Sequence, residues 1–165
     1  MDKRTYRLRP LAVKDAERMN EWMHDEDVMR FMRMDGSKST VESARAFIER
    51  SADESVNVHR AIVDGEDTYM GTVSLKEIEG GRAEYAICLH SDAIGKGAAA
   101  DATDGILNVA FDELGLDEVY LNVRTDNVRA WLFYEKYGFV YTHTTPENIN
   151  GEAVELKWYT AKREK

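Results

Sequence analysis

Alternating polar and apolar residues indicate where strands are expected. Residues 5–11 alternate until a proline interrupts them, which predicts a first strand with Tyr6 and Leu8 turned inward. Other short apolar runs predict strands over residues 58–63, 68–75, 82–90, 119–123, 139–141 and 153–159. Because turn residues separate the first three of these runs, residues 57–90 should form an antiparallel meander.

Helices are predicted where apolar residues recur every three or four positions. This spacing occurs over residues 13–23, 26–33, 41–51, 98–114 and 127–137. The resulting order, β-α-α-α-β-β-β-α-β-α-β-β, predicts an α/β (α+β) fold in which helices flank a mixed, mostly antiparallel central sheet. The sequence contains no repeat, low-complexity tract or linker, so we expect residues 1–165 to form a single domain.

Composition narrows the classes of partner. The chain has 165 residues, of which 43% are hydrophobic, so it can bury a core without disulfide or metal support. Its net charge of −9 repels phosphate backbones, and no apolar run is long enough to span a bilayer. We therefore expect neither a nucleic-acid nor a membrane partner. An acidic surface is typical of ordinary solubility, but it also attracts cationic substrates.

Cysteine and histidine usage argues against disulfide and metal sites. Cys88 is the only cysteine, so no internal disulfide and no cysteine-based zinc site can form. The four histidines lack the spacing of metal ligands, so we expect no bound metal. The first residues contain no apolar signal segment, and these features together predict a reducing, cytoplasmic location.

The most informative segment is the run IGKGAAA at residues 94–100, between a predicted strand and a predicted helix. Its small side chains leave backbone N–H groups uncovered at the start of a helix, where a pyrophosphate could bind. The alternative is that small residues only allow close packing of helix and sheet. A Walker A loop is excluded because Gly97, not Ser or Thr, follows Lys96. Gly95, Gly97 and Ala100 match a dinucleotide-binding fingerprint, but a meander precedes them and no acidic residue ends the next strand.

Two motifs give the chain a resemblance to the GNAT family of N-acetyltransferases. Residues 94–99 resemble the family's acetyl-CoA loop, written Arg/Gln-x-x-Gly-x-Gly/Ala. The run from Asn127 to Phe139 resembles its Asn-x-x-Ala-x-x-x-Tyr-Glu-Lys-x-Gly-Phe signature. Residues 7–11 and 71–75 are similar to the branch that holds ribosomal-protein, spermidine and nucleotide-amino-sugar acetyltransferases, so the resemblance covers nearly the whole chain.

The resemblance implies a GNAT-like fold that binds acetyl-CoA between two splayed strands, here residues 82–90 and 119–123. Pantetheine would pair with unpaired strand backbone, and the pyrophosphate would lie on the loop. Ile94 stands where Arg or Gln is usual, so one phosphate donor is absent or is replaced by Lys96. The residues that the resemblance assigns to cofactor binding are Ile87, Cys88, Leu89, Ile94, Gly95, Lys96, Gly97, Ala98, Ala99, Ala100, Asn122, Asn127, Ala130 and Phe133.

The resemblance also implies direct transfer of the acetyl group to a primary amine. Tyr134 would protonate the departing thiolate of coenzyme A. The amine must first lose a proton, for which Glu84 is the first candidate and Ser74 the second. The alternative for Glu84 is a solvated strand residue. Asn127 caps a helix, contacts pantetheine, or does both.

The acceptor is expected near an acidic, aromatic-bearing segment that contains Glu21, Trp22, Asp25 and Glu26, although a solvated face is the alternative. A polyamine, an amino sugar and a protein N-terminus all fit as small-molecule or peptide acceptors. Two other functions remain open. One is a GNAT module that binds coenzyme A without catalysis, and the other is a nicotinamide-dinucleotide-binding protein. A homodimer is compatible with each of these hypotheses.

Overall fold

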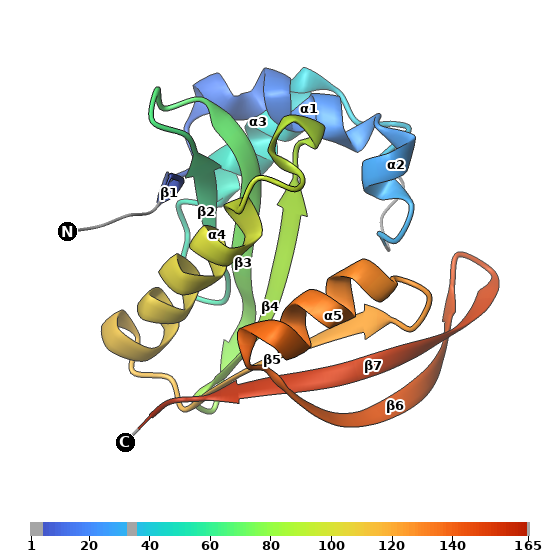
Figure 1. Cartoon of the computed structure of the whole chain (residues 1–165). Helices are drawn as coiled ribbons and strands as arrows, with labels where there is room; N and C mark the ends of the chain where they lie inside the picture. The colour runs from blue at the N-terminus through green and yellow to red at the C-terminus, as the bar shows by residue number, and fades with distance from the viewer. Residues whose placement is uncertain (1–4, 33–35, 165) are drawn as a thin grey trace.

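One seven-stranded sheet runs through the described part of the chain, residues 5–32 and 36–164 of this computed structural model (Figure 1). Its strand order is β1-β2-β3-β4-β5-β7-β6. The strands are β1 (Arg7–Pro10), β2 (Val58–Val63), β3 (Tyr69–Glu79), β4 (Arg82–Leu89), β5 (Glu118–Arg124), β6 (Val140–Ile149) and β7 (Glu152–Lys162). The helices are η1 (Val13–Asp15), α1 (Ala16–Met23), α2 (Glu26–Met29), α3 (Val41–Arg50), η2 (Ser91–Ala93), α4 (Ala98–Asn108), the π-helical turn η3 (Val109–Glu113) and α5 (Val128–Tyr137).

The predicted fold class is confirmed, with differences at three elements. The helix predicted over 26–33 is the single turn α2, beyond which the Phe31 ring packs against the guanidinium groups of Arg30 and Arg124. Residue 33 lies outside the described residues. The helix predicted over 98–114 ends in the π-helical turn η3. The short strand predicted over 139–141 is the ten-residue β6, whose two faces are both largely exposed and therefore show no alternation.

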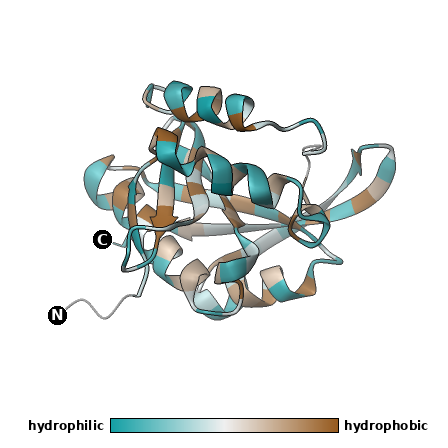
Figure 2. Ribbon diagram, turned by 90° about the horizontal axis from the view of Figure 1, so that it is seen from above, coloured by the Kyte–Doolittle hydropathy of each residue, from teal (hydrophilic) through white to brown (hydrophobic). Residues whose placement is uncertain are grey.

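Two apolar cores lie on opposite faces of the sheet. On one face α4 and α5 pack against β2 to β5 and β7, burying residues such as Leu75, Tyr85, Ile106, Leu121 and Tyr134. On the other face α1 and α3 pack against β2 and β3, burying Met19, Trp22, Ile48, Ala61 and Tyr69. Hydrophobic and hydrophilic positions alternate along the ribbons of Figure 2, as expected for elements with one face on a core.

The sheet is incomplete at its centre, where β4 meets β5. These neighbouring parallel strands pair only at Arg82–Glu118, Ala83–Val119 and Glu84–Tyr120. Beyond those pairs the strands diverge, as Figure 1 shows, while β4 remains paired with β3 as far as Leu89. The predicted splay between residues 82–90 and 119–123 is therefore confirmed. Among the residues that the structure describes, no strand pairs with this edge of β4 beyond Glu84.

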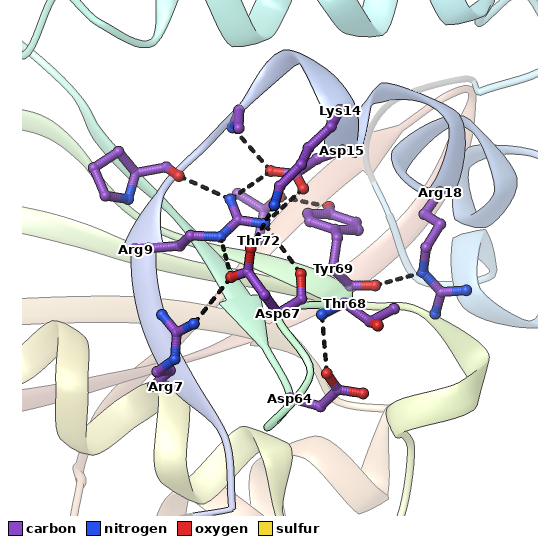
Figure 3. Close-up of polar contacts among 12 residues, drawn as sticks. Arg7, Arg9, Lys14, Asp15, Arg18, Asp64, Asp67, Thr68, Tyr69 and Thr72 are labelled. Carbon is purple, nitrogen blue, oxygen red and sulfur yellow. Dashed lines mark hydrogen bonds and ion pairs between the residues drawn. The ribbon is translucent and has the colours of Figure 1, made fainter.

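A network of charged side chains connects β1 to η1 and to the turn between β2 and β3 (Figure 3). The Arg9 guanidinium donates to both carboxylate oxygens of Asp15, at 2.8 and 2.9 Å, and to Asp67 at 2.7 Å. Lys14 also pairs with Asp67, and these hydrogen bonds hold the pKa of the Asp67 carboxyl well below its usual range. The network joins β1, η1 and the turn between β2 and β3, so α1 starts from a fixed point.

Candidate functional site

The first cleft, which we call the helix-side cleft, lies between diverging β4 and the N-terminal ends of α4 and α5. It encloses about 460 Å³. Its walls include most of the predicted cofactor-binding residues, namely Ile87, Leu89, Ile94, Gly95, Gly97, Ala98, Ala99, Ala100, Asn127, Ala130 and Phe133. Residues from β4, the glycine loop and α5 therefore meet in one place, although more than 40 positions separate Ile87 from Phe133 in the sequence.

The glycine loop forms one end of the helix-side cleft. Gly95 and Gly97 have φ angles of 79° and 86°, in the left-handed region that favours glycine. Gly97 occupies the N-cap position of α4, and alanines follow it at the next three positions. The first N–H groups of any helix have no partner within that helix, and here only methyl groups flank them. This geometry offers an anion several backbone donors at a helix N-terminus.

Arg129 adds a cation that the sequence interpretation missed. It lines the helix-side cleft from the first turn of α5, and its Nη2 atom lies 3.3 Å from the point where a Cβ atom on Gly95 would stand. A guanidinium therefore lies beside the loop where Ile94 supplies no charge. Lys96, the predicted replacement, is exposed and does not line the cleft. The sequence did contain a signal for Arg129: it lies two residues after Asn127, and therefore near the same N-terminal end of the predicted helix.

The second cleft, which we call the strand-side cleft, opens on the other side of the gap and encloses about 270 Å³. Glu84 lines it beside its register partner Lys76 on β3. The pKa of the nearby Tyr120 hydroxyl is raised by burial and by the Glu84 carboxylate. Cys88 and Asn122, both predicted as cofactor-binding residues, line this cleft rather than the helix-side cleft.

Tyr134 forms part of the wall between the two clefts and lines both of them. Its side chain is 8% exposed, and its ring stands edge-on to that of Tyr85, with centroids 5.8 Å apart. Burial, and secondarily the neighbouring Tyr85, raises the pKa of the Tyr134 hydroxyl well above 10. A phenol in this environment keeps its proton at neutral pH, which is the state a proton donor requires.

Asn127 also lines both clefts, from the N-cap position of α5. Its side chain makes no capping hydrogen bond, so of its two predicted roles the helix-cap role is not observed. Its place in the walls of both clefts is consistent with the predicted contact to a ligand.

Ser74, the second candidate for proton removal, lies away from both clefts. It is 4% exposed, and its Oγ atom lies 2.6 Å from Nδ1 of His59. Burial, with a smaller contribution from the positive charge of Lys76, lowers the pKa of His59 to about 4. The neutral His59–Ser74 pair is therefore part of the core beneath α3, where no amine could reach it.

The acidic segment divides between two environments. Asp25 and Glu26 line a third cleft of about 730 Å³, the outer cleft, which shares Met32, Arg124 and Ile149 with the strand-side cleft. Asp25 also caps α2 by accepting hydrogen bonds from the backbone N–H groups of residues 27 and 28.

The other two residues of that segment, Glu21 and Trp22, line none of the three clefts. Trp22 is buried and donates its indole N–H to the Tyr69 hydroxyl at 2.9 Å. The carboxylate of Glu21 lies 2.7 Å from Nε2 of His90. Both side chains are therefore committed to contacts within the protein.

Phe31 and Met32 complete the site and were not predicted as site residues. Both line the helix-side and strand-side clefts, so they lie over the gap from the segment that follows α2. Their apolar side chains fitted the helical pattern of residues 26–33, which concealed this position. Among residues 5–32 and 36–164, no cluster of His, Cys, Asp or Glu is arranged to hold a metal ion. Over the same residues, no helix is both long enough and apolar enough to cross a membrane.

Known proteins share this architecture. The family model described as "Acetyltransferase (GNAT) domain" matches residues 6–140. The spermidine N(1)-acetyltransferase of Escherichia coli K12 is 30% identical over 135 residues, which cover 81% of this chain and 72% of the relative. The spermidine N(1)-acetyltransferase of Vibrio cholerae is 33% identical over 107 residues, which cover 61% of this chain and 62% of the relative.

Solved structures show the same fold. The crystal structure of spermidine N-acetyltransferase from Vibrio cholerae in complex with CoA and spermine matches with a TM-score of 0.86 and 23% identity. The match covers 96% of this chain and 95% of that one. The family match favours the acetyl-CoA loop over the dinucleotide-binding fingerprint for residues 94–100.

Proposed function

The chain belongs to the GNAT acetyltransferase family and is an acetyl-CoA-dependent N-acetyltransferase, and on that premise we propose that its acceptor is a polyamine. The observation that carries this proposal is the position of Glu84, whose carboxylate lines the gap on the side opposite the glycine loop. From there the strand-side cleft continues into the outer cleft, where Asp25 and Glu26 lie. The relatives named as spermidine acetyltransferases support the same acceptor class.

In this proposal acetyl-CoA occupies the helix-side cleft. The loop N–H groups of residues 95–100 and the guanidinium of Arg129 hold the pyrophosphate, each charge-assisted bond contributing about 1.5–3 kcal/mol. Pantetheine lies along the unpaired edge of β4 at residues 87–89 and takes the place of the missing strand. The acetyl thioester then reaches the gap beside Tyr134.

The amine approaches from the strand-side cleft. An alkylammonium has a pKa near that of lysine, about 10.4, so it must lose a proton before it can attack. Glu84 accepts that proton directly or through water. The amine nitrogen then forms a bond with the thioester carbonyl carbon, the C–S bond breaks, and the departing thiolate takes the proton of the Tyr134 hydroxyl. The newly bonded nitrogen gives up its second proton, which returns through water to the Tyr134 oxygen, and Glu84 passes the first proton to solvent.

Individual carboxylates, rather than the net charge of the walls, would select the acceptor. Lys76 lies beside Glu84, so the inner region is not uniformly acidic. Arg124 is compensated by ion pairs of 2.8 Å to Asp126 and 2.9 Å to Glu152. A chain with amines at intervals could place one group at Glu84 while another is bound near Glu26.

An amine panel tests the proposal. Release of coenzyme A is followed with spermidine, spermine, a diamine, an amino sugar and a short peptide that has a free N-terminus. Saturable turnover should appear with the polyamines and be much weaker with the amino sugar and the peptide. Glu84→Gln should lower turnover of the best amine, while Glu79→Gln, an exposed glutamate at the far end of β3, should not. Turnover restricted to the amino sugar or the peptide would contradict the polyamine assignment.

A further inference from the structure

His90 joins helix α1 to the start of the glycine loop through both of its ring nitrogens. The backbone N–H of Asp92 donates to Nδ1 at 3.1 Å, so Nδ1 is an acceptor and carries no proton. The proton of the neutral ring therefore lies on Nε2, which donates to Glu21 Oε2 at 2.7 Å. The His90 ring is only 8% exposed, whereas the Glu21 side chain that accepts from it is 55% exposed, so the hydrogen bond is made at the protein surface by a buried ring.

Arg18 makes a second connection between the same two elements. Its Nη2 atom lies 3.2 Å from Oδ2 of Asp92. Its Nε donates to the Tyr69 carbonyl at 2.6 Å, a hydrogen bond drawn in Figure 3. Helix α1 is itself firmly placed, since Met19 and Trp22 belong to the core beneath it. Two side chains from an anchored helix therefore hold η2, the turn that leads into the glycine loop.

The loop that follows has few other attachments. Ala93 is buried, whereas every residue from Ile94 to Gly97 is exposed. Two glycines in this stretch adopt left-handed conformations, and glycine restricts the backbone less than any other residue. The direction in which the loop N–H groups point is consequently fixed mainly at its two ends, at η2 and at α4.

We propose that Glu21, Arg18 and His90 are positioning residues for the acetyl donor, acting through the loop on its pyrophosphate. The inference rests on the proposed binding of acetyl-CoA in the helix-side cleft. A loop already held in its binding conformation loses less conformational entropy when the pyrophosphate binds, so the connection to α1 raises donor affinity without touching the donor. Glu21, expected from the sequence to face the acceptor, thus serves the other substrate.

Two donors separate this role from a general contribution to folding. Acetyl-CoA uses the loop, whereas S-acetylpantetheine has no pyrophosphate and does not. Glu21→Ala should raise the KM for acetyl-CoA and the Kd for CoA about five- to tenfold, with little change in kcat. The KM for S-acetylpantetheine should stay unchanged. Glu17→Ala, which removes an exposed carboxylate from the same helix, is the matched control.

Two conservative variants sharpen the test. Glu21→Gln keeps an oxygen that can accept from His90 and should restore most of the CoA affinity. His90→Asn keeps a cap for the Asp92 N–H but loses the reach to Glu21, so it should behave like Glu21→Ala. Equal losses with both donors, or no loss with either, would overturn the inference. A wild-type protein that neither binds CoA nor uses acetyl-CoA would instead overturn the proposed donor site.

Discussion

The helix-side and strand-side clefts meet at the same gap but are built by different means. The helix-side cleft is lined largely by glycine, alanine and aliphatic residues and offers backbone groups of the loop and of β4. The strand-side cleft presents charged side chains from three strands, among them Lys76, Glu84 and Arg124. A site built from backbone needs a continuous run of small residues, whereas a site built from side chains can draw single residues from anywhere in the fold.

Tyr134 belongs to both clefts, and removing its hydroxyl should have the largest effect on turnover. Tyr134→Phe keeps the buried ring but cannot give a proton to the departing thiolate. General acid catalysis contributes about 10²–10⁴-fold, and a thiolate with a pKa of about 8.5 is a tolerable leaving group, so kcat should fall roughly 10²-fold. Single-turnover rates at saturating acetyl-CoA measure this loss.

The matched control is Tyr137→Phe, at another tyrosine of α5, which removes a hydroxyl that is hydrogen-bonded to Asp104 of α4. That variant should retain the wild-type rate, and both variants should bind CoA as the wild type does. An unchanged single-turnover rate in Tyr134→Phe would remove Tyr134 from the mechanism and leave it as a packing residue.

A substitution of Arg129 tests whether side-chain charge contributes to CoA binding in the helix-side cleft, where most of the proposed contacts come from backbone groups. Arg129→Ala removes the guanidinium beside Gly95 and should weaken CoA binding about tenfold, corresponding to one charge-assisted hydrogen bond of about 1.5 kcal/mol. Calorimetry with CoA measures this directly. Lys96→Ala makes the same change of charge outside the cleft and should have little effect; a greater loss in Lys96→Ala would assign the pyrophosphate to Lys96.

His59, in the core beneath α3 and outside both clefts, should make the stability of the protein depend on pH. Burial lowers its pKa from about 6.5 to about 4, so the unfolded chain takes up a proton more readily than the folded one. Its contribution to stability is therefore complete above pH 6.5 and is lost as the pH falls from 6.5 towards 4. Between pH 7 and pH 5.5 the loss should be about 1.2 kcal/mol, measured by urea unfolding at the two pH values.

Removing the titrating ring should abolish that part of the pH dependence. In His59→Gln the difference in unfolding free energy between the two pH values should shrink by about the same 1.2 kcal/mol. His143→Gln, at an exposed histidine on β6, should keep the wild-type difference. An unaltered pH dependence in His59→Gln would show that His59 is not held in its neutral form.

The outer cleft should give the smallest effect. Glu26→Lys reverses an exposed charge, and exposed ion pairs contribute about 0.2–1 kcal/mol, so the KM for a polyamine should rise no more than about fivefold. The KM for acetyl-CoA should be unaffected. The matched control is Glu42→Lys, which makes the same charge reversal at an exposed residue of α3. Identical kinetics in the two variants would make Glu26 a solvated residue with no part in acceptor binding.

The same difference between the clefts explains what the sequence could and could not predict. Residues 94–100 were recognisable because backbone binding imposes a local pattern of small residues. The splay was predictable because the family resemblance implies it. Glu84 was placed correctly on its strand, but whether it faced a cleft or solvent depended on the divergence of β5.

Side-chain partners were the least predictable feature. Nothing near Glu21 in the sequence indicates His90, which lies 69 positions away. From the sequence, Trp22 could line an aromatic pocket or belong to the core. Its hydrogen bond to the Tyr69 hydroxyl shows that it belongs to the core. Such pairings depend on how the helices pack against the sheet. Hydrophobic periodicity specifies which face of a helix is buried, but it does not specify which polar atoms come into contact.

The strand order also has a consequence for synthesis of the protein. Strand β5 forms three residue pairs with β4 but seven with β7, which ends at residue 162. A nascent chain that has just released Asn127 and Tyr134 from the ribosome therefore still lacks the strand that holds β5 in place. The gap therefore acquires its final width only after residues 156–162 of β7 have emerged and paired with β5.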